Sequence, residues 1–452
     1  MAIEDVQHPV MAAQAAFGPF AAIAPVDDPC WRGGAGPLAG LLTSVKDIVD
    51  VAGLPTRRGS RLSADAPPAT ADAGAVARLR AAGAAIVAKS TTTEHAHSPL
   101  GYAPLEGLTR NPWNPARTCG GSSSGAGVAV ATGATPLALA TDAGCSTRLP
   151  AALSGVFGLK PTLGRIPHEK LPDCFANIVH LGLITASVDL MERAHAVLAH
   201  PHRLDAQSLG LPPFDPPPFD PPPFDPPSSS GPGLEGARIL LWLRVGNDLV
   251  DPAMLDLMDQ VRRRLEVLGA RVDQADCPLP NPTPAWRVLQ QSAWADRMGG
   301  LPPDRRALLS PSLDAGIEAG LRHSAVDMLR ALATRTAMFR AVQSLLGTTH
   351  DYIVTPCASA PAVAADHPVD APLEIGGRVA GPLRDAWLPY LSLFDLSGHP
   401  ALSLPAGMDG AGVPMGFQMV APWAGEAALL RAARQWEAAF PFPALPRDWL
   451  TL

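Results

Sequence analysis

The chain has 452 residues, of which 47 % are hydrophobic and 17 % charged, and its mean hydropathy is +0.11. This composition excludes a mostly disordered protein, because disordered chains hold too few apolar residues to bury a core. The formal net charge of −7 provides no basic surface for nucleic acid, so no nucleic-acid partner is expected.

The N-terminal residues and the cysteines favour a cytoplasmic protein. The chain begins Met1-Ala2-Ile3-Glu4-Asp5, which is acidic where a secretory signal needs positive charge. The six cysteines are scattered with no C-x-x-C pair, so neither a disulfide framework nor a zinc site is predicted. We expect mostly buried free thiols in a reducing compartment.

Residues 37–165 alternate between short apolar runs and a helical pattern. One apolar run ends at Val45-Lys46-Asp47, and Ala75–Ala82 has helical spacing. Ala84–Ala88 and Pro136–Thr141 are short apolar segments typical of buried strands. This alternation predicts an α/β core in which helices cover a central sheet.

The stretch Thr118–Thr141 has 24 residues without a charge, which is long enough to span a bilayer. It contains three consecutive serines and several glycines, and Pro136 interrupts it. We therefore predict a buried helix and strand, and no membrane partner.

Residues 211–233 are rich in proline, and Pro-Pro-Phe-Asp recurs there at Phe214, Phe219 and Phe224. Such proline density favours extended polyproline II structure and excludes helix. We interpret the segment as a surface linker or loop. The alternative is a ligand for a polyproline-binding module, in which case the chain would be an interaction protein.

The α/β pattern then resumes. Arg238–Val245 and Tyr352–Val354 are predicted strands, and helices are predicted from Asp251 to Gly269 and near Gly425–Phe440.

Residues 284–345 look helical and carry two tryptophans, Trp286 and Trp294. We expect this helical region to form the mouth of a pocket. The two tryptophans would then favour hydrophobic or aromatic substrates.

Two turns rich in small residues are the segments most typical of catalysis. They are Gly120-Gly121-Ser122-Ser123-Ser124-Gly125 and Thr141-Asp142-Ala143-Gly144-Cys145-Ser146-Thr147-Arg148. Without the pattern G-x-x-x-x-G-K-[ST], a P-loop is disfavoured. A serine in a tight turn after a strand exposes a hydroxyl beside backbone N–H donors, as acyl transfer requires.

A serine nucleophile needs a base. No G-x-S-x-G elbow surrounds Ser146, and the histidines follow no recognisable triad order. His95 and His97 would share one strand face, but a metal pair lacks a third ligand, so no metal is predicted. Lys46 ends an apolar run, where burial would lower its pKa from ~10.4 toward the ~7–8 of a useful base. From the residues alone, a surface lysine stays the alternative.

Seven segments, taken in order, resemble the amidase signature family, and the resemblance covers most of residues 36–440. The segments are Gly36–Gly40 with Ser44–Asp47, Asn111–Arg117, Gly120–Gly125, Thr141–Arg148 with Pro150-Ala151, Gly158–Arg165, Leu396–Pro405 and Gly416–Val420. The resemblance implies the amidase signature fold, an α/β architecture whose mixed central β-sheet carries helices on both faces.

The resemblance also implies a single domain over residues 1–452. Within it, 36–200 would form the N-terminal core with the triad, 211–233 the proline-rich linker or loop, and 234–452 the C-terminal part of the core.

A Ser–cis-Ser–Lys triad is implied, with Ser146 as nucleophile, Ser122 as the bridging serine in a cis peptide, and Lys46 as base. The reaction would hydrolyse a carbonyl C–N bond through an acyl-enzyme, with no cofactor. The implied oxyanion hole consists of the backbone N–H groups of Ala143, Gly144, Cys145 and Ser146.

Family members cut amides, ureas and carbamates, including urethanes, and the residues do not select among these small-molecule substrates. Two alternatives share the fold: the glutaminase component of a tRNA-dependent amidotransferase, and a non-catalytic scaffold. The N-terminal helical arm of many members is not evident in this sequence, so a homodimer is not inferred from it and stays open.

The sequence departs from the family at two cysteines. Cys145 stands where Gly-Gly-Ser is usual, and it would be strained and narrow the pocket if that backbone required a positive φ. Cys119 replaces a common proline and is interpreted as a packed thiol. Cys145 is not expected to be the nucleophile. Asp142 and Arg148 flank the second turn and are expected to pair and brace it.

Overall fold

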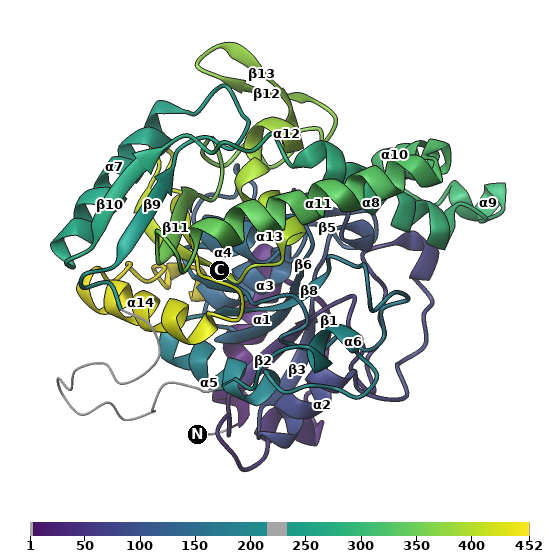
Figure 1. Ribbon diagram of the computed structural model, residues 1–452. Helices are drawn as coiled ribbons and strands as arrows, with labels where there is room; N and C mark the ends of the chain where they lie inside the picture. The colour runs from purple at the N-terminus through teal and green to yellow at the C-terminus, as the bar shows by residue number, and fades with distance from the viewer. Residues whose placement is uncertain (1–2, 215–232, 452) are drawn as a thin grey trace.

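The computed structural model describes residues 3–214 and 233–451, and one eleven-stranded sheet runs through its centre (Figure 1). Its strands, in spatial order, are β1 (Phe20–Ile23), β3 (Ala85–Ser90), β2 (Leu42–Lys46), β6 (Leu137–Asp142), β8 (His180–Thr185), β7 (Phe157–Lys160), β14 (Ala401–Met408), β15 (Pro414–Val420), β11 (Tyr352–Pro356), β9 (Arg238–Trp242) and β10 (Arg271–Ala275). Two small hairpins lie outside it, β4 (Tyr102–Ala103) with β5 (Gly107–Leu108), and β12 (Pro372–Ile375) with β13 (Arg378–Pro382).

The sheet is mixed, as predicted. The strands β3, β2 and β6 are parallel to one another, and so are β11, β9 and β10. Between these two groups, from β6 through β8, β7, β14 and β15 to β11, every neighbouring pair is antiparallel. Strands from both halves of the sequence therefore share one sheet.

Helices cover both faces of the sheet, which confirms the predicted fold class. Alternate residues of β9 show the two layers: Ile239 and Leu241 pack with α7 and α14, whereas Leu240 and Trp242 pack with α8 and α11. The helices of the described residues are α1 (Ile3–Phe17), α2 (Gly74–Ala81), α3 (Ser124–Ala131), α4 (Arg148–Ser154), α5 (Val188–Leu198), α6 (Ala206–Leu209), α7 (Pro252–Val267), α8 (Thr283–Met298), α9 (Pro303–Arg306), α10 (Pro311–Arg322), α11 (Ala325–Leu345), α12 (Leu383–Trp387), α13 (Pro389–Ser397) and α14 (Glu426–Ala439).

The uncharged stretch Thr118–Thr141 forms α3 and β6, both in the core, as predicted. A Cβ added to Gly125 would lie 2.0 Å from the Pro19 carbonyl oxygen, so only glycine lets α3 pack this closely. Nowhere in residues 3–214 or 233–451 is a helix both long and apolar enough to cross a membrane.

The structure has an N-terminal helix that is not evident in the sequence. Residues Ile3–Phe17 form α1, although Pro9 lies within it. Proline in a helix interior removes a hydrogen bond and makes the segment look non-helical. Here Val10, Ala13 and Phe17 are buried at helical spacing, and the Phe17 ring contacts Trp449 edge-on at 5.6 Å. This packing outweighs the local preference.

The expected strand carrying His95 and His97 is wrong. A 3₁₀ turn occupies Glu94–Ala96, and His95 and Ala96 have φ angles of 45° and 60°. The helical prediction for residues 284–345 holds, since α8, α9, α10 and α11 lie there (Figure 1). Most of the proline-rich segment, including Phe219 and Phe224, lies outside the described residues.

Candidate active site

Lys46 is the last residue of β2, and its side chain has no exposed surface. Its Nζ atom lies 2.7 Å from Ser122 Oγ, 2.9 Å from Thr141 Oγ1 and 3.5 Å from the Thr141 carbonyl oxygen. Thr141 lies near the end of β6, the parallel neighbour of β2. The surface-lysine alternative is therefore excluded.

Burial lowers the pKa of Lys46 to about 7, despite the opposing effect of Asp142. A charged lysine has three N–H donors, which here meet Ser122 Oγ and the two oxygen atoms of Thr141. Loss of one proton leaves two donors for Thr141 and a lone pair that can accept the Ser122 hydroxyl. In the sequence Thr141 stands out only as part of a motif, because its place beside Lys46 follows from the pairing of the two strands.

Ser122 lies just before α3, and the peptide bond between Gly121 and Ser122 is cis, as the resemblance implies. Ser122 has no surface exposed to bulk solvent, and it lines an internal cavity. The next residue, Ser123, donates its backbone N–H to the Ser146 carbonyl at 3.2 Å. This hydrogen bond joins the two small-residue turns found in the sequence.

Asp142 accepts backbone hydrogen bonds from the turn that carries Ser146 and so stabilises it. The Asp142 carboxylate accepts the backbone N–H groups of Ser146 at 2.8 Å and Thr147 at 3.1 Å. It also pairs with the buried Arg148 guanidinium at 2.9 Å, which confirms the predicted brace. Burial alone would raise the pKa of Asp142, but Arg148 and these hydrogen bonds hold it well below its ordinary value.

Arg148 extends the brace across the sheet to the C-terminal half. It donates to Asp395 at 2.6 Å, to Gln418 at 3.0 Å and to the Leu391 carbonyl at 3.1 Å. Because a buried charge without partners is costly, this complete set of partners fixes the turn in one position.

Two of the four backbone N–H groups that the resemblance implies for the oxyanion hole already have an acceptor within the protein. The backbone N–H groups of Gly144 and Ser146 already donate to Asp142, at 3.3 and 2.8 Å. Within the described residues no acceptor takes the N–H groups of Ala143 and Cys145. These two are therefore the donors that a developing oxyanion could use.

Cys145 is not strained, because its φ angle lies outside the positive range that would require glycine. Its side chain is not among those that line the large cavity and packs in an apolar cluster with Leu149 and Trp387, and its thiol contacts the Gly121 carbonyl at 3.5 Å. Burial raises the pKa of this thiol. The Cys145 side chain therefore does not narrow the pocket, contrary to the expectation from the sequence.

Ser122 and Ser146 open into a cavity of about 910 Å³ that Trp286 and Trp294 also line. The exposed fraction of Ser146 is 8 %, and its hydroxyl makes no hydrogen bond to any of the described residues. Trp286 donates its indole N–H to the Ala143 carbonyl, and the two indole rings meet edge-on at 6.3 Å. The predicted pocket region therefore supplies part of the cavity wall.

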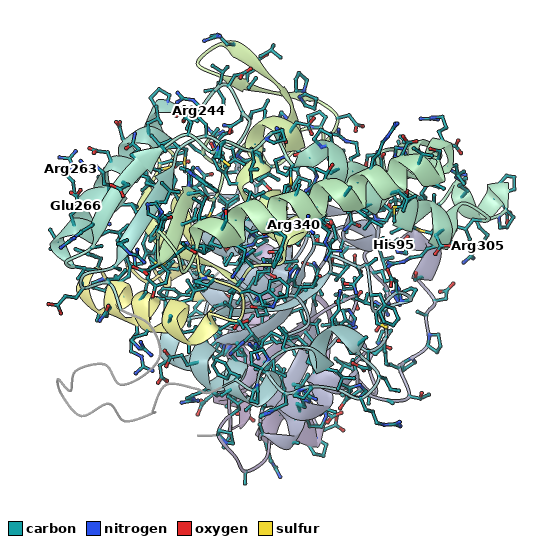
Figure 2. The ribbon with its side chains drawn as sticks, viewed as in Figure 1. His95, Arg244, Arg263, Glu266, Arg305 and Arg340 are labelled. Atoms are coloured by element: carbon teal, nitrogen blue, oxygen red, sulfur yellow. The ribbon has the colours of Figure 1, made fainter. Side chains whose placement is uncertain are left out.

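His95 and His97 have separate surroundings. His95 lines the large cavity (labelled in Figure 2), and burial lowers its pKa to about 4. His97 instead contacts Ser312 at 2.8 Å and the Glu94 carbonyl at 2.7 Å. Where the structure describes the chain, three or more His, Cys, Asp or Glu side chains never gather in an arrangement that could hold a metal.

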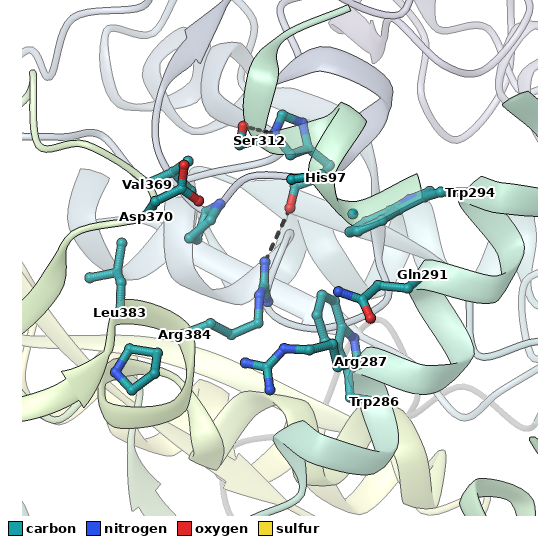
Figure 3. Close-up of a pocket in the computed structure, with 14 residues that line it drawn as sticks. His97, Trp286, Arg287, Gln291, Trp294, Ser312, Val369, Asp370, Leu383 and Arg384 are labelled. Atoms are coloured by element: carbon teal, nitrogen blue, oxygen red, sulfur yellow. Dashed lines mark hydrogen bonds between the residues drawn. The ribbon is translucent and has the colours of Figure 1, made fainter. Parts of the chain in front are cut away.

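Arg384 was not predicted as a site residue, because it belongs to no motif and is 238 residues from Ser146 in the sequence. It lies at the start of α12, and its guanidinium stacks on the Trp286 ring with 4.0 Å to the ring centre (Figure 3). A Cβ on Gly144 would lie 3.0 Å from Arg384 Nη1 and 2.8 Å from Trp286 Nε1. Glycine at position 144 therefore lets both side chains pack against the turn.

Known proteins resemble this chain over most of its length. The family model described as "Amidase" matches residues 22–430. An acylamidase from Rhodococcus erythropolis is 31 % identical over 409 residues, which cover 90 % of this chain and 83 % of the relative. A glutamyl-tRNA(Gln) amidotransferase component from Symbiobacterium thermophilum is 31 % identical over 415 residues, 85 % and 80 % of the two chains. The solved structure of 6-aminohexanoate cyclic dimer hydrolase superposes with a TM-score of 0.83 at 26 % identity, covering 99 % and 95 %.

Proposed function

Because this chain belongs to the amidase family, whose members hydrolyse carbonyl C–N bonds, we propose that it cuts an amide through an acyl-enzyme on Ser146. Ser122 and Lys46 would relay the proton. The observation that carries the proposal is the 2.7 Å contact between Lys46 and Ser122, beside a cavity that both Ser122 and Ser146 line.

In the first step the Ser146 oxygen bonds to the carbonyl carbon, its proton passes to Ser122, and the Ser122 proton passes to Lys46. The N–H groups of Ala143 and Cys145 would hold the oxyanion, each donor contributing roughly 3–4 kcal/mol of transition-state stabilisation. The C–N bond then breaks, and the proton returns through Ser122 to the leaving amine. Water cleaves the acyl-enzyme by the same relay, which restores Ser146.

Burial supports Lys46 as the base. A lysine with a pKa near 7 is about half neutral at pH 7, whereas an ordinary lysine is almost entirely charged. In the neutral form, the two oxygen atoms of Thr141 accept both N–H donors and the lone pair is directed to Ser122. A general base works best with a pKa near the working pH.

The test is p-nitroaniline release from an acyl anilide and from the matching carbamate, with the wild type and Ser146→Ala side by side. Release that depends on Ser146, with an acyl adduct on the intact protein by mass spectrometry, supports the proposal. The faster substrate separates amide from carbamate hydrolysis. A Ser146→Ala variant as active as the wild type would overturn it, and a wild type that forms no adduct with any acyl donor would indicate a scaffold.

The glutaminase component of an amidotransferase is the second candidate, because relatives named as parts of glutamyl-tRNA(Gln) amidotransferase reach 31 and 32 % identity. That function predicts ammonia release from glutamine and copurification with partner proteins. Purification from the native source, followed by a glutaminase assay, distinguishes it from a free amidase. Size-exclusion chromatography of the same preparation measures whether the chain is a homodimer.

A further inference from the structure

Arg384 forms part of the wall between two cavities. One is the large cavity that contains Ser122 and Ser146, and the other is a cavity of about 300 Å³ lined by His97 and Asp370 among others (Figure 3). Trp286 and Trp294 also line both. Arg384 is therefore the cation at the boundary of the two spaces.

The guanidinium of Arg384 has few protein partners. It donates to the His97 carbonyl at 3.4 Å and approaches the Cys145 thiol at 3.8 Å, and its face lies on Trp286. It forms no ion pair with a carboxylate of the described residues, whereas the neighbouring Arg287 pairs with Asp385. Asp370 lines the smaller cavity but is not within ion-pair distance of Arg384. Most of the five N–H donors of Arg384 are thus available to a ligand.

Two further arginines, Arg58 and Arg297, line the large cavity, and neither forms an ion pair within residues 3–214 and 233–451. The cavity therefore contains three guanidinium groups without a carboxylate partner. Arg384 is the one that packs against the turn carrying Ser146, as its closeness to Gly144 shows.

The three acidic residues that line the large cavity form no ion pair with Arg384. Asp50 pairs with Lys170 at 2.7 Å, and Asp173 accepts the backbone N–H of Ala176 at 3.1 Å. Asp296 is exposed and lies next to Arg297 in the sequence. None of these three hydrogen-bonds to residues 143–146.

We propose that Arg384 binds a carboxylate on the substrate, so that this enzyme prefers amides that carry a carboxylate a few bonds from the scissile C–N bond. The inference rests on the proposed hydrolysis at Ser146. A planar guanidinium binds a carboxylate through two parallel hydrogen bonds, and the stacked indole ring fixes its plane. With Arg384 beside Gly144, a carboxylate held there leaves a short spacer to a carbonyl at Ser146.

The activity test uses the p-nitroanilide of succinic acid, which has a free carboxylate, and its methyl ester, which has none. We expect the wild type to prefer the acid at least tenfold in kcat/KM. Arg384→Gln should lose about 10- to 100-fold on the acid and less than threefold on the ester, while Arg384→Lys keeps part of the preference. Arg340→Gln is the matched control, because Arg340 is exposed on α11 outside both cavities (Figure 2).

Equal kcat/KM for acid and ester in the wild type would overturn the proposal, and so would an equal loss on both substrates in Arg384→Gln. A binding measurement is independent of hydrolysis. Succinate should change the tryptophan fluorescence of Ser146→Ala with a saturable curve, and adding Arg384→Gln should weaken the Kd at least tenfold. Binding without turnover in the wild type would contradict the proposed hydrolysis and keep the carboxylate site, whereas no binding would contradict the site.

Discussion

Two buried lysines at strand ends make the clearest comparison in this molecule. Lys46 ends β2 and Lys160 ends β7, both side chains have no exposed surface, and burial lowers the pKa of each to about 7. Yet, among the described residues, Lys160 donates to the carbonyl oxygens of His399 and Pro161 alone, at 2.6 and 3.2 Å.

The difference lies in the hydrogen-bond partners of each amine. Two carbonyl oxygens accept the N–H donors of Lys160, and no hydroxyl of the described residues lies beside that amine to give it a proton. Lys46 faces the Ser122 hydroxyl, and Ser122 opens into the cavity. A lowered pKa therefore does not make a lysine a base unless a proton donor and a route to substrate lie beside it.

The largest expected effect is the loss of activity when Lys46 is replaced, which the same replacement of Lys160 should not cause. Lys46→Met should reduce kcat/KM by about 10³-fold, because general-base catalysis contributes about 10²–10⁴-fold. Lys160→Met should change kcat/KM by less than about threefold per folded molecule. Steady-state kinetics with circular dichroism checks both. Comparable losses in the two variants would break the comparison.

Ser122→Ala tests the proton donor of the pair. Removing the hydroxyl leaves Lys46 buried and near neutral but without its relay, so kcat should fall about 10²-fold while KM changes little. The matched control is Ser392→Ala, which removes a buried hydroxyl bonded at 3.2 Å to the Gly144 carbonyl outside the relay. A control loss as large as that of Ser122→Ala would assign the effect to packing of the turn.

The pH dependence of activity should follow Lys46. Its amine must be neutral to accept a proton, so kcat/KM should rise about tenfold per pH unit below pH 7 and level off above it. Lys160→Met should keep this profile unchanged. A profile that is flat from pH 5.5 to 9 under chemistry-limited conditions would contradict Lys46 as the base.

The two lysines should contribute equally to the pH dependence of stability, and this contribution is the smallest of the expected effects. Between pH 7 and about 10 the unfolded chain binds a proton at each lysine that the folded chain does not, so the free energy of unfolding rises with pH. Each Met variant should lower that slope by about 1 kcal/mol per pH unit. Urea unfolding at pH 7.5 and 9.5 measures it, and unequal slopes would show that the two lysines are not equally depressed.

Much of the fold was predictable, because strands and helices leave local patterns. The apolar run before Lys46, the uncharged stretch Thr118–Thr141 and the helical region at 284–345 all form the predicted elements. The prediction failed where a local signal opposed the packing. Pro9 makes the segment of α1 look non-helical in the sequence. At His95 the backbone has a positive φ angle, which the spacing of the histidines does not indicate.

The sequence alone determined the family, the order of the motifs and the residue types that the chemistry needs, since these depend on short stretches of neighbouring residues. Only the tertiary structure decided which groups face one another. Strand pairing sets Thr141 beside Lys46, the Asp142 carboxylate takes two of the four N–H groups expected for the oxyanion, and α12 brings Arg384 to the cavity. Each is a contact between segments or a competition for one donor, and both depend on distance in space, which residue spacing along the chain does not specify.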